Sequence, residues 1–201
     1  MELNSWLSDN YIEIFGAVTG ILYVFFEIRQ NIWLWPVGIA TSAVYIIVFF
    51  TNKFYADMSL QGYYLVISVL GWYWWLRGGG LRAQDAGHRA QGEKLQVTRL
   101  KIKTGIILIF IWITLYLGMW FVLDRLTDSP VPEWDSFITS LSIIATWMLA
   151  RKIYEHWYLW IIVNAASVIL FITRGLYPTV ILYLIYFAMS FVGLRAWKRS
   201  L

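Results

Sequence analysis

The sequence contains no cysteine among its 201 residues. That absence excludes disulfides, thiolate metal sites and cysteine nucleophiles. Charge is also scarce, because charged residues make up 14% of the chain, whereas a soluble domain carries about a quarter. The two histidines are His88, in a polar segment, and His156, which we expect in a loop, and no GxSxG or HExxH motif is present. We therefore expect neither an enzyme nor a bound metal or cofactor.

Apolar residues dominate instead, with 60% hydrophobic and 19% aromatic residues and a mean hydropathy of +0.61. An apolar run of about 17–25 residues is long enough to cross a bilayer as a helix. The runs are continuously apolar rather than alternating, so we expect helices rather than strands. The sequence predicts an all-α membrane protein with seven transmembrane helices near residues 11–28, 33–50, 58–76, 104–123, 135–150, 157–173 and 178–197.

Basic residues gather on one side of the predicted membrane. When the loops are assigned to alternate sides, thirteen of the sixteen basic residues fall on one side. The other side keeps Lys53, Arg125 and Arg174 and holds eight of the twelve acids. The positive-inside rule then places the N-terminus outside and the C-terminus in the cytoplasm. The first ten residues are polar and acidic, so we expect no cleavable signal peptide.

The two halves of the chain repeat each other. Residues 13–77 align on residues 135–199 without a gap, at an offset of 122, and sixteen of the 65 positions are identical. The identities include three polar pairs, Arg29/Arg151, Thr51/Thr173 and Ser68/Ser190. Each copy holds three helices, so the unpaired helix between them gives both copies the same orientation. We predict one transmembrane domain over 1–201, with repeats at 11–77 and 135–199, a cytoplasmic linker at 78–103 and a connecting helix at 104–123.

This 3+1+3 arrangement of parallel repeats bears on function. Transporters often have such symmetry and bind their substrate near the midplane, where the repeats meet. A duplicated membrane protein can also be a receptor or scaffold, or a membrane enzyme. The missing catalytic motifs disfavour the enzyme, and we expect a transporter.

Polar and aromatic residues recur at helical spacing in four of the predicted spans. Trp157, Trp160 and Asn164 lie three and seven residues apart and share one helix face. Because an amide is costly against lipid, we expect this face to line a cavity. The corresponding sets on the other spans are Trp35, Gly38 and Ser42; Gln61, Tyr64 and Ser68; and Tyr183, Tyr186 and Ser190.

The two halves of this expected cavity differ. Gly38 occupies the position of Trp160 in the other repeat, and we expect it to leave room for a flat ring stacked on Trp160. Asn164 and Gln61 would then bind the polar substituents of that ring. No basic residue lies near the midplane, so a neutral or cationic ring fits better than an anion, with about 1–2 kcal/mol from a tryptophan face.

The tryptophans at the expected membrane surface have different interpretations. Trp35 pairs with Trp157 at the expected cytoplasmic mouth, where the two act as a gate or cap or else belong to the interfacial aromatic belt. Trp33 has Glu155 at its repeat position, and we expect it in the belt.

The segments NKFYADMSLQ and GWYWW in the first half, and WDS and HWYLWIIVN in the second, resemble the PnuC family of bacterial vitamin transporters. The resemblance covers nearly the whole chain. It implies a full-length SWEET-like fold, usually a homotrimer in the inner membrane. It also implies uptake of nicotinamide riboside by facilitated diffusion, with a cytoplasmic kinase that traps the substrate. Gln61, Trp157, Trp160 and Asn164 match the binding motifs of the family.

One departure from the family bears on the substrate. Members that carry nicotinamide riboside tend to have an asparagine on the second helix, where this chain has Thr41 and Ser42. The segments NIWLWP and FYADM resemble the thiamine-transporting PnuT branch. We place nicotinamide riboside narrowly first and thiamine as the alternative, and we expect no nucleic-acid partner. The predicted substrate-binding residues are Trp160, Asn164, Gln61, Tyr64, Trp157, Ser68, Tyr186 and Ser42.

Overall fold

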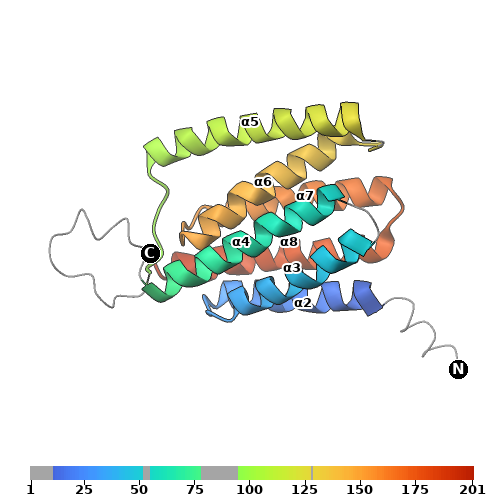
Figure 1. The fold of residues 1–201 in the computed structure, drawn as a ribbon. Coiled ribbons are helices and arrows are strands. Elements are labelled where there is room, and N and C mark those ends of the chain that lie inside the picture. The colour runs from blue at the N-terminus through green and yellow to red at the C-terminus, as the bar shows by residue number, and fades with distance from the viewer. Residues whose placement is uncertain (1–10, 52–54, 78–94, 128) are drawn as a thin grey trace, which may run out of the picture. The chain divides into compact units, whose positions relative to one another are not determined.

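A computed structural model describes residues 11–51, 55–77, 95–127 and 129–201. The described residues form seven α-helices (Figure 1), and these are α2 (Tyr11–Ile28), α3 (Leu34–Thr51), α4 (Tyr55–Arg77), α5 (Ile102–Leu126), α6 (Pro132–Ala150), α7 (His156–Thr173) and α8 (Tyr177–Lys198). They coincide with the seven predicted runs to within a few residues, so the all-helical class is confirmed. The chain divides into two compact units, residues 1–73 and 74–201, with the boundary inside α4.

Four of the described helices are long and apolar enough to cross a membrane, namely α3, α5, α7 and α8. α6 illustrates why a helix can fail this criterion. Its Ser136, Ser140, Ser142 and Thr146 are all buried, so its polar side chains lie inside the protein rather than against lipid. The Ser142 and Thr146 hydroxyls donate to carbonyls one turn earlier, at 2.7 and 2.8 Å. Seven crossings remain a prediction.

The turn between α2 and α3 and the turn between α6 and α7 have the same backbone hydrogen bonds. Asn31 N and Ile153 N each donate to a carbonyl five residues earlier, at 2.8 and 2.9 Å. Gln30 and Lys152 both have a positive φ, 51° and 50°. A left-handed residue followed by this bond is the Schellman motif that ends many helices. Both pairs of residues lie 122 apart, which is the offset of the sequence repeat.

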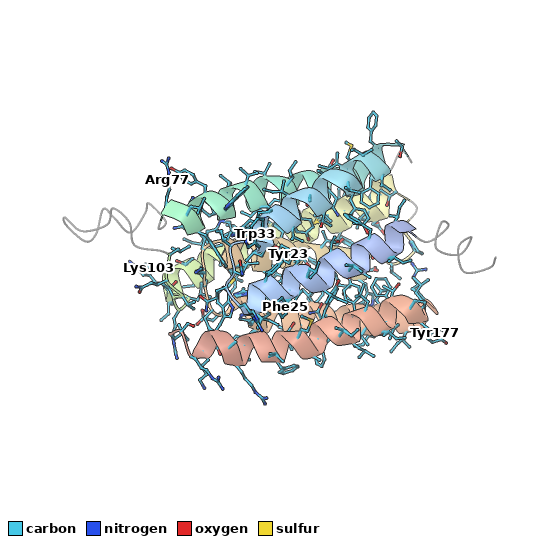
Figure 2. The ribbon with its side chains drawn as sticks, turned by 90° about the horizontal axis from the view of Figure 1, so that it is seen from below. Tyr23, Phe25, Trp33, Arg77, Lys103 and Tyr177 are labelled. Carbon is cyan, nitrogen blue, oxygen red and sulfur yellow. The ribbon has the colours of Figure 1, made fainter. Side chains whose placement is uncertain are left out.

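In the second unit, consecutive helices pack against one another, α5 on α6, α6 on α7 and α7 on α8. Leu108 of α5 meets Ile144 and Met148 of α6 and Ile153 of the following turn in a hydrophobic cluster. Labelled basic residues lie at one end of this unit. Figure 2 shows Arg77 and Lys103 near one end and Tyr177 near the opposite end.

Residues 95–101, which we call the strap, pair with the turn between α6 and α7. Thr98 N donates to Lys152 O, and Tyr154 N donates to Thr98 O, both at 2.9 Å. Leu100 N donates to the Glu155 carboxylate at 2.7 Å. This part of the predicted linker is therefore held by hydrogen bonds, and α5 begins at Ile102 rather than at 104. Residues 78–94 of the predicted linker lie outside the described residues.

Candidate functional site

Asn164 is joined to α8 through a buried hydroxyl group. It lies midway along α7 and is 5% exposed. Its Nδ2 donates to Ser190 Oγ at 3.1 Å, and the Ser190 hydroxyl donates to the Tyr186 carbonyl at 2.8 Å. The close packing of α7 against α8 brings Asn164 to Ser190, whereas the bond from Ser190 to Tyr186 lies within α8. Two residues predicted to line the cavity, Asn164 and Tyr186, are thus connected through Ser190.

The Asn164 side chain retains capacity for further hydrogen bonds. A primary amide offers two N–H donors and one carbonyl acceptor, and within the described residues the side chain bonds to Ser190 alone. Trp160 lies one turn earlier on the same face, and its buried indole Nε1 has no hydrogen-bond partner in that part of the chain. An unmade hydrogen bond at a buried polar group costs about 1–3 kcal/mol. Trp160 and Asn164 thus place buried polar groups on one face of α7, and their binding roles stay predictions.

A series of aromatic rings links this region to the other end of α7. The Phe171 and Tyr183 ring centroids are 5.1 Å apart, and those of Tyr183 and Tyr186 are 5.6 Å apart with the rings near perpendicular. The backbone carbonyl of Tyr186, rather than its ring, accepts the hydrogen bond from Ser190. Helical spacing indicated Tyr183 and Tyr186, but it gave no sign of Phe171, because that contact crosses between two helices.

Trp35 and Trp157 are packed against glycines at repeat-related positions. A Cβ atom at Gly71 would overlap the Trp35 indole, and a Cβ atom at Gly193 would overlap the Trp157 indole. The two tryptophans are 0% and 1% exposed, so the belt interpretation is wrong for both. Trp33, by contrast, is 61% exposed, as a belt residue would be. The gate or cap role of Trp35 and Trp157 stays a prediction.

His156, which we expected in a loop, lies beside Trp157 in the helix. That histidine is the first residue of α7 rather than a loop residue, and it is fully buried. Its Nδ1 lies 2.7 Å from the Ile153 carbonyl, and its ring centroid lies 4.8 Å from that of Trp157 and 4.6 Å from that of Trp197.

Two cations of the same turn lie over aromatic rings. Lys152 Nζ is 4.2 Å from the Trp75 ring centroid, and the Arg151 guanidinium is 4.9 Å from that of Trp74. Burial lowers the pKa of Arg151. These contacts hold the start of α7 in place. The start of α7 lies at the end of the second unit that carries most of that unit's described basic residues. Along the helix axis, Trp157 is about 10 Å from Asn164.

In the first unit, the space expected beside Gly38 is filled. A Cβ atom at Gly38 would lie 3.0 Å from Ser68 Oγ and 3.0 Å from a ring carbon of Tyr23. The expectation that Gly38 leaves room is therefore wrong. The repeat positions of Gly38 and Tyr23 are Trp160 and Ala145, so the large and small residues are exchanged between the two repeats. Helical spacing within one segment could not reveal an exchange between two helices.

The remaining predicted residues of the first unit lie on α3 and α4. Ser42 and Ser68 are buried, whereas Gln61 and Tyr64 are half-buried. The Tyr64 ring lies 5.5 Å from that of Tyr63, edge to face. The structure brings Ser68 to α3 through Gly38, and the binding roles of all four residues stay predictions.

Known proteins resemble this chain over nearly its full length. Residues 10–199 match the family described as nicotinamide mononucleotide transporter. The chain is 27% identical to the nicotinamide riboside transporter PnuC of Escherichia coli K12, an alignment that covers 95% of this chain and 86% of that protein. It is 24% identical to the riboflavin/roseoflavin transporter RibM of Streptomyces davaonensis, covering 95% and 87%.

The fold has a counterpart among solved structures. The crystal structure of the vitamin B3 transporter PnuC matches with a TM-score of 0.71 at 23% identity, covering 98% of this chain and 84% of that one. The family match extends over all seven described helices. This chain is therefore a member of the nicotinamide mononucleotide transporter family, the PnuC family of multi-pass membrane transporters for vitamins.

Proposed function

We propose that this chain takes up a flat cationic vitamin precursor by facilitated diffusion, with nicotinamide riboside as the first candidate. The observation that carries the proposal is the buried Asn164, whose amide has a single hydrogen bond to a protein group within the described residues. The curated relatives in Escherichia coli and Neisseria mucosa are named for nicotinamide riboside. A carboxamide on a pyridinium ring would donate to and accept from Asn164 while the ring lies on Trp160.

The charge of the substrate follows from the residues of α7 and α8. α7 carries no Asp, Glu, Lys or Arg, and in α8 the basic residues are confined to the last turn. An anionic phosphate would find no counter-charge there, whereas a tryptophan face attracts a cation by about 1–2 kcal/mol. α7 and α8 therefore offer no carboxylate in their middle for proton coupling. Transport would then run down the substrate gradient, and phosphorylation by a cytoplasmic kinase would trap the vitamin.

Thiamine is the alternative substrate. It is also a flat cation with a hydroxyl group, and Thr41 and Ser42 of this chain stand where members of the family that carry nicotinamide riboside tend to have an asparagine. Ser42 is buried on α3, so its hydroxyl group would be a short hydrogen-bonding group where an asparagine would offer a longer amide. Riboflavin enters the comparison because RibM is among the relatives.

The proposal includes an assembly and an orientation. The distribution of basic residues supports an N-terminus outside and a C-terminus in the cytoplasm of a bacterial inner membrane. The equivalent turns after α2 and α6 support the two parallel three-helix repeats, with α5 as the connecting helix. The homotrimer follows from the family resemblance.

Calorimetric titration of the purified protein tests the site. We expect nicotinamide riboside or thiamine to bind the wild-type protein, and Trp160→Ala to abolish binding because the ring loses its stacking surface. Trp33→Ala is the matched control, since the same aromatic group is removed from an exposed position. Equal loss of affinity in both variants would refute the assignment of Trp160, and no binding of nicotinamide riboside, thiamine or riboflavin would refute the proposed function.

A further inference from the structure

A cavity lies in the second unit at the end where α7 stops and α6 begins. Its volume is about 290 Å³, close to the lower limit of about 300 Å³ for small-molecule sites. Leu170, Phe171 and Arg174 come from the end of α7, and Val131, Asp135 and Leu176 complete the lining. This is the end opposite the basic cluster of Arg77 and Lys103 (Figure 2).

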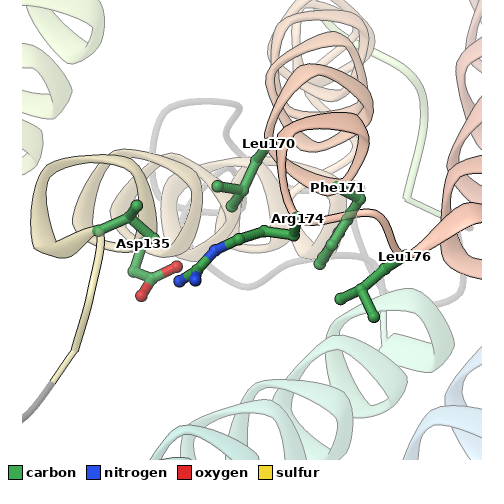
Figure 3. A pocket seen from close by; sticks show the side chains of 6 residues that line it. Asp135, Leu170, Phe171, Arg174 and Leu176 are labelled. Carbon is green, nitrogen blue, oxygen red and sulfur yellow. The ribbon is translucent and has the colours of Figure 1, made fainter.

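Two opposite charges face each other across this cavity. Figure 3 shows the Asp135 carboxylate and the Arg174 guanidinium directed toward one another. The carboxylate accepts a hydrogen bond from Ser129 Oγ at 2.8 Å, which fixes its position. The Arg174 guanidinium has no hydrogen bond or ion pair with any residue that the structure describes. The two groups thus line the same cavity without a salt bridge between them.

A ligand that contacts both of these charges must present one kind of chemical group. A carboxylate accepts hydrogen bonds only, and a guanidinium donates them only. A group that bridges the two must therefore present an N–H donor beside an oxygen or nitrogen acceptor. A primary carboxamide has this pattern, and so does the amino-pyrimidine edge of thiamine. The Phe171 ring in the same cavity offers a surface for the plane of the attached ring.

We propose that this cavity is a capture site, in which the vitamin lies against Phe171 with its donor–acceptor edge between Asp135 and Arg174. The inference rests on the proposed function and adds a second binding position to it. Asn164 and Phe171 are seven residues apart and share a face of α7, with a rise of about 10 Å between them. The Phe171, Tyr183 and Tyr186 rings run from the cavity toward Asn164. This row of rings begins at the cavity and extends along α8 in the direction of Ser190, which accepts the hydrogen bond from Asn164.

Initial uptake rates with two matched substrates test the capture site. Nicotinamide riboside carries the carboxamide, and nicotinic acid riboside carries a carboxylate in its place. Asp135→Asn should lower Vmax/KM for the amide about tenfold, as expected for a lost charge-assisted hydrogen bond. The same variant should raise Vmax/KM for the acid, because it removes the repulsion between two carboxylates. Arg174→Gln should lower Vmax/KM for both substrates.

A charge pair at the same end of the second unit supplies the control. Asp124 and Arg125 form an exposed ion pair at the end of α5, with Nε and Oδ2 3.1 Å apart, and neither lines the cavity. Asp124→Asn and Arg125→Gln should leave both rates unchanged. If thiamine is the vitamin that the wild-type protein takes up, oxythiamine replaces the acid, since its donor and acceptor are exchanged.

The outcomes separate this inference from the proposed function. A wild-type protein that transports none of these vitamins would overturn both. A transporting wild-type protein with unchanged rates in Asp135→Asn and Arg174→Gln would overturn the capture site alone. Equal losses for amide and acid in both variants would also overturn it, because a loosened fold does not distinguish between the two substrates.

Discussion

Trp157 lies on Gly193 where α7 meets α8, and Trp35 lies on Gly71 where α3 meets α4. A glycine at a helix contact lets a large ring approach the backbone of the neighbouring helix, as small residues do in many membrane proteins. Both tryptophans and both glycines lie 122 residues apart. The same contact is therefore made once in each repeat of the sequence.

Substitution of Gly193 by alanine should destabilise the protein. In a helix, alanine is normally more favourable than glycine by about 0.5–1 kcal/mol. Here the added methyl group would overlap the buried Trp157 ring, and overpacking of this kind costs about 1–3 kcal/mol. We expect a lower midpoint of thermal unfolding for Gly193→Ala in detergent. Gly118→Ala on α5 is the matched control, because nothing lies within 4 Å of a Cβ atom there; equal midpoints for the two variants would contradict this packing.

The placement of a single residue could be predicted from the sequence where the spacing within one helix determined it. The spacing of Trp160 and Asn164 placed both on one face of α7, and burial of the amide followed from its cost in lipid. The space beside Gly38 was predicted wrongly, because Tyr23 of another helix fills it. Arg174 was predicted only as a charge of one side, and Asp135 stood only in the WDS segment of the family resemblance. Nothing in their spacing indicated a shared cavity.

The strap connects the segment before α5 to the turn that starts α7. Three backbone N–H groups in this contact have partners, and one partner is the Glu155 carboxylate. A charged acceptor makes a shorter and stronger hydrogen bond than a neutral one. The start of α7, which carries His156 and Trp157, is thereby held on its outer side as well as by packing.

Removal of the Glu155 carboxylate should release the strap. Glu155→Ala leaves the Leu100 N–H without its acceptor, and the loss should lower the free energy of unfolding by about 1–3 kcal/mol. Hydrogen exchange measured by mass spectrometry should become faster in residues 95–101. Glu133→Ala provides the control, since Glu133 is an exposed residue in the first turn of α6. Unchanged exchange in Glu155→Ala would show that the strap is held by other contacts.

Helices were predicted from the sequence more successfully than the segments between them. A continuous apolar run has few alternatives to a helix in lipid, because the backbone must satisfy its own hydrogen bonds. The strap has no comparable signal, since its polar residues are equally typical of a free linker. α5 was extended by two residues at its start and by three at its end relative to the predicted run.

Over the whole chain, the internal sequence repeat has counterparts in the backbone. Sequence identity at an offset of 122 is accompanied by nearly equal φ values at Gln30 and Lys152 and by equivalent hydrogen bonds in the two turns. A vitamin B3 transporter shares the fold. The receptor, scaffold and enzyme alternatives gain no support from the relatives named above, all of which are transporters.

Uptake into liposomes is the most direct test of transport by facilitated diffusion. The purified protein would be reconstituted into liposomes that contain the matching vitamin kinase and ATP, with nicotinamide riboside or thiamine added outside. We expect phosphorylated vitamin to accumulate without any sodium or proton gradient, and the internal vitamin to stop at the external concentration when the kinase is omitted. Accumulation that requires an ion gradient, or no entry of either vitamin, would contradict facilitated diffusion of a vitamin by this protein.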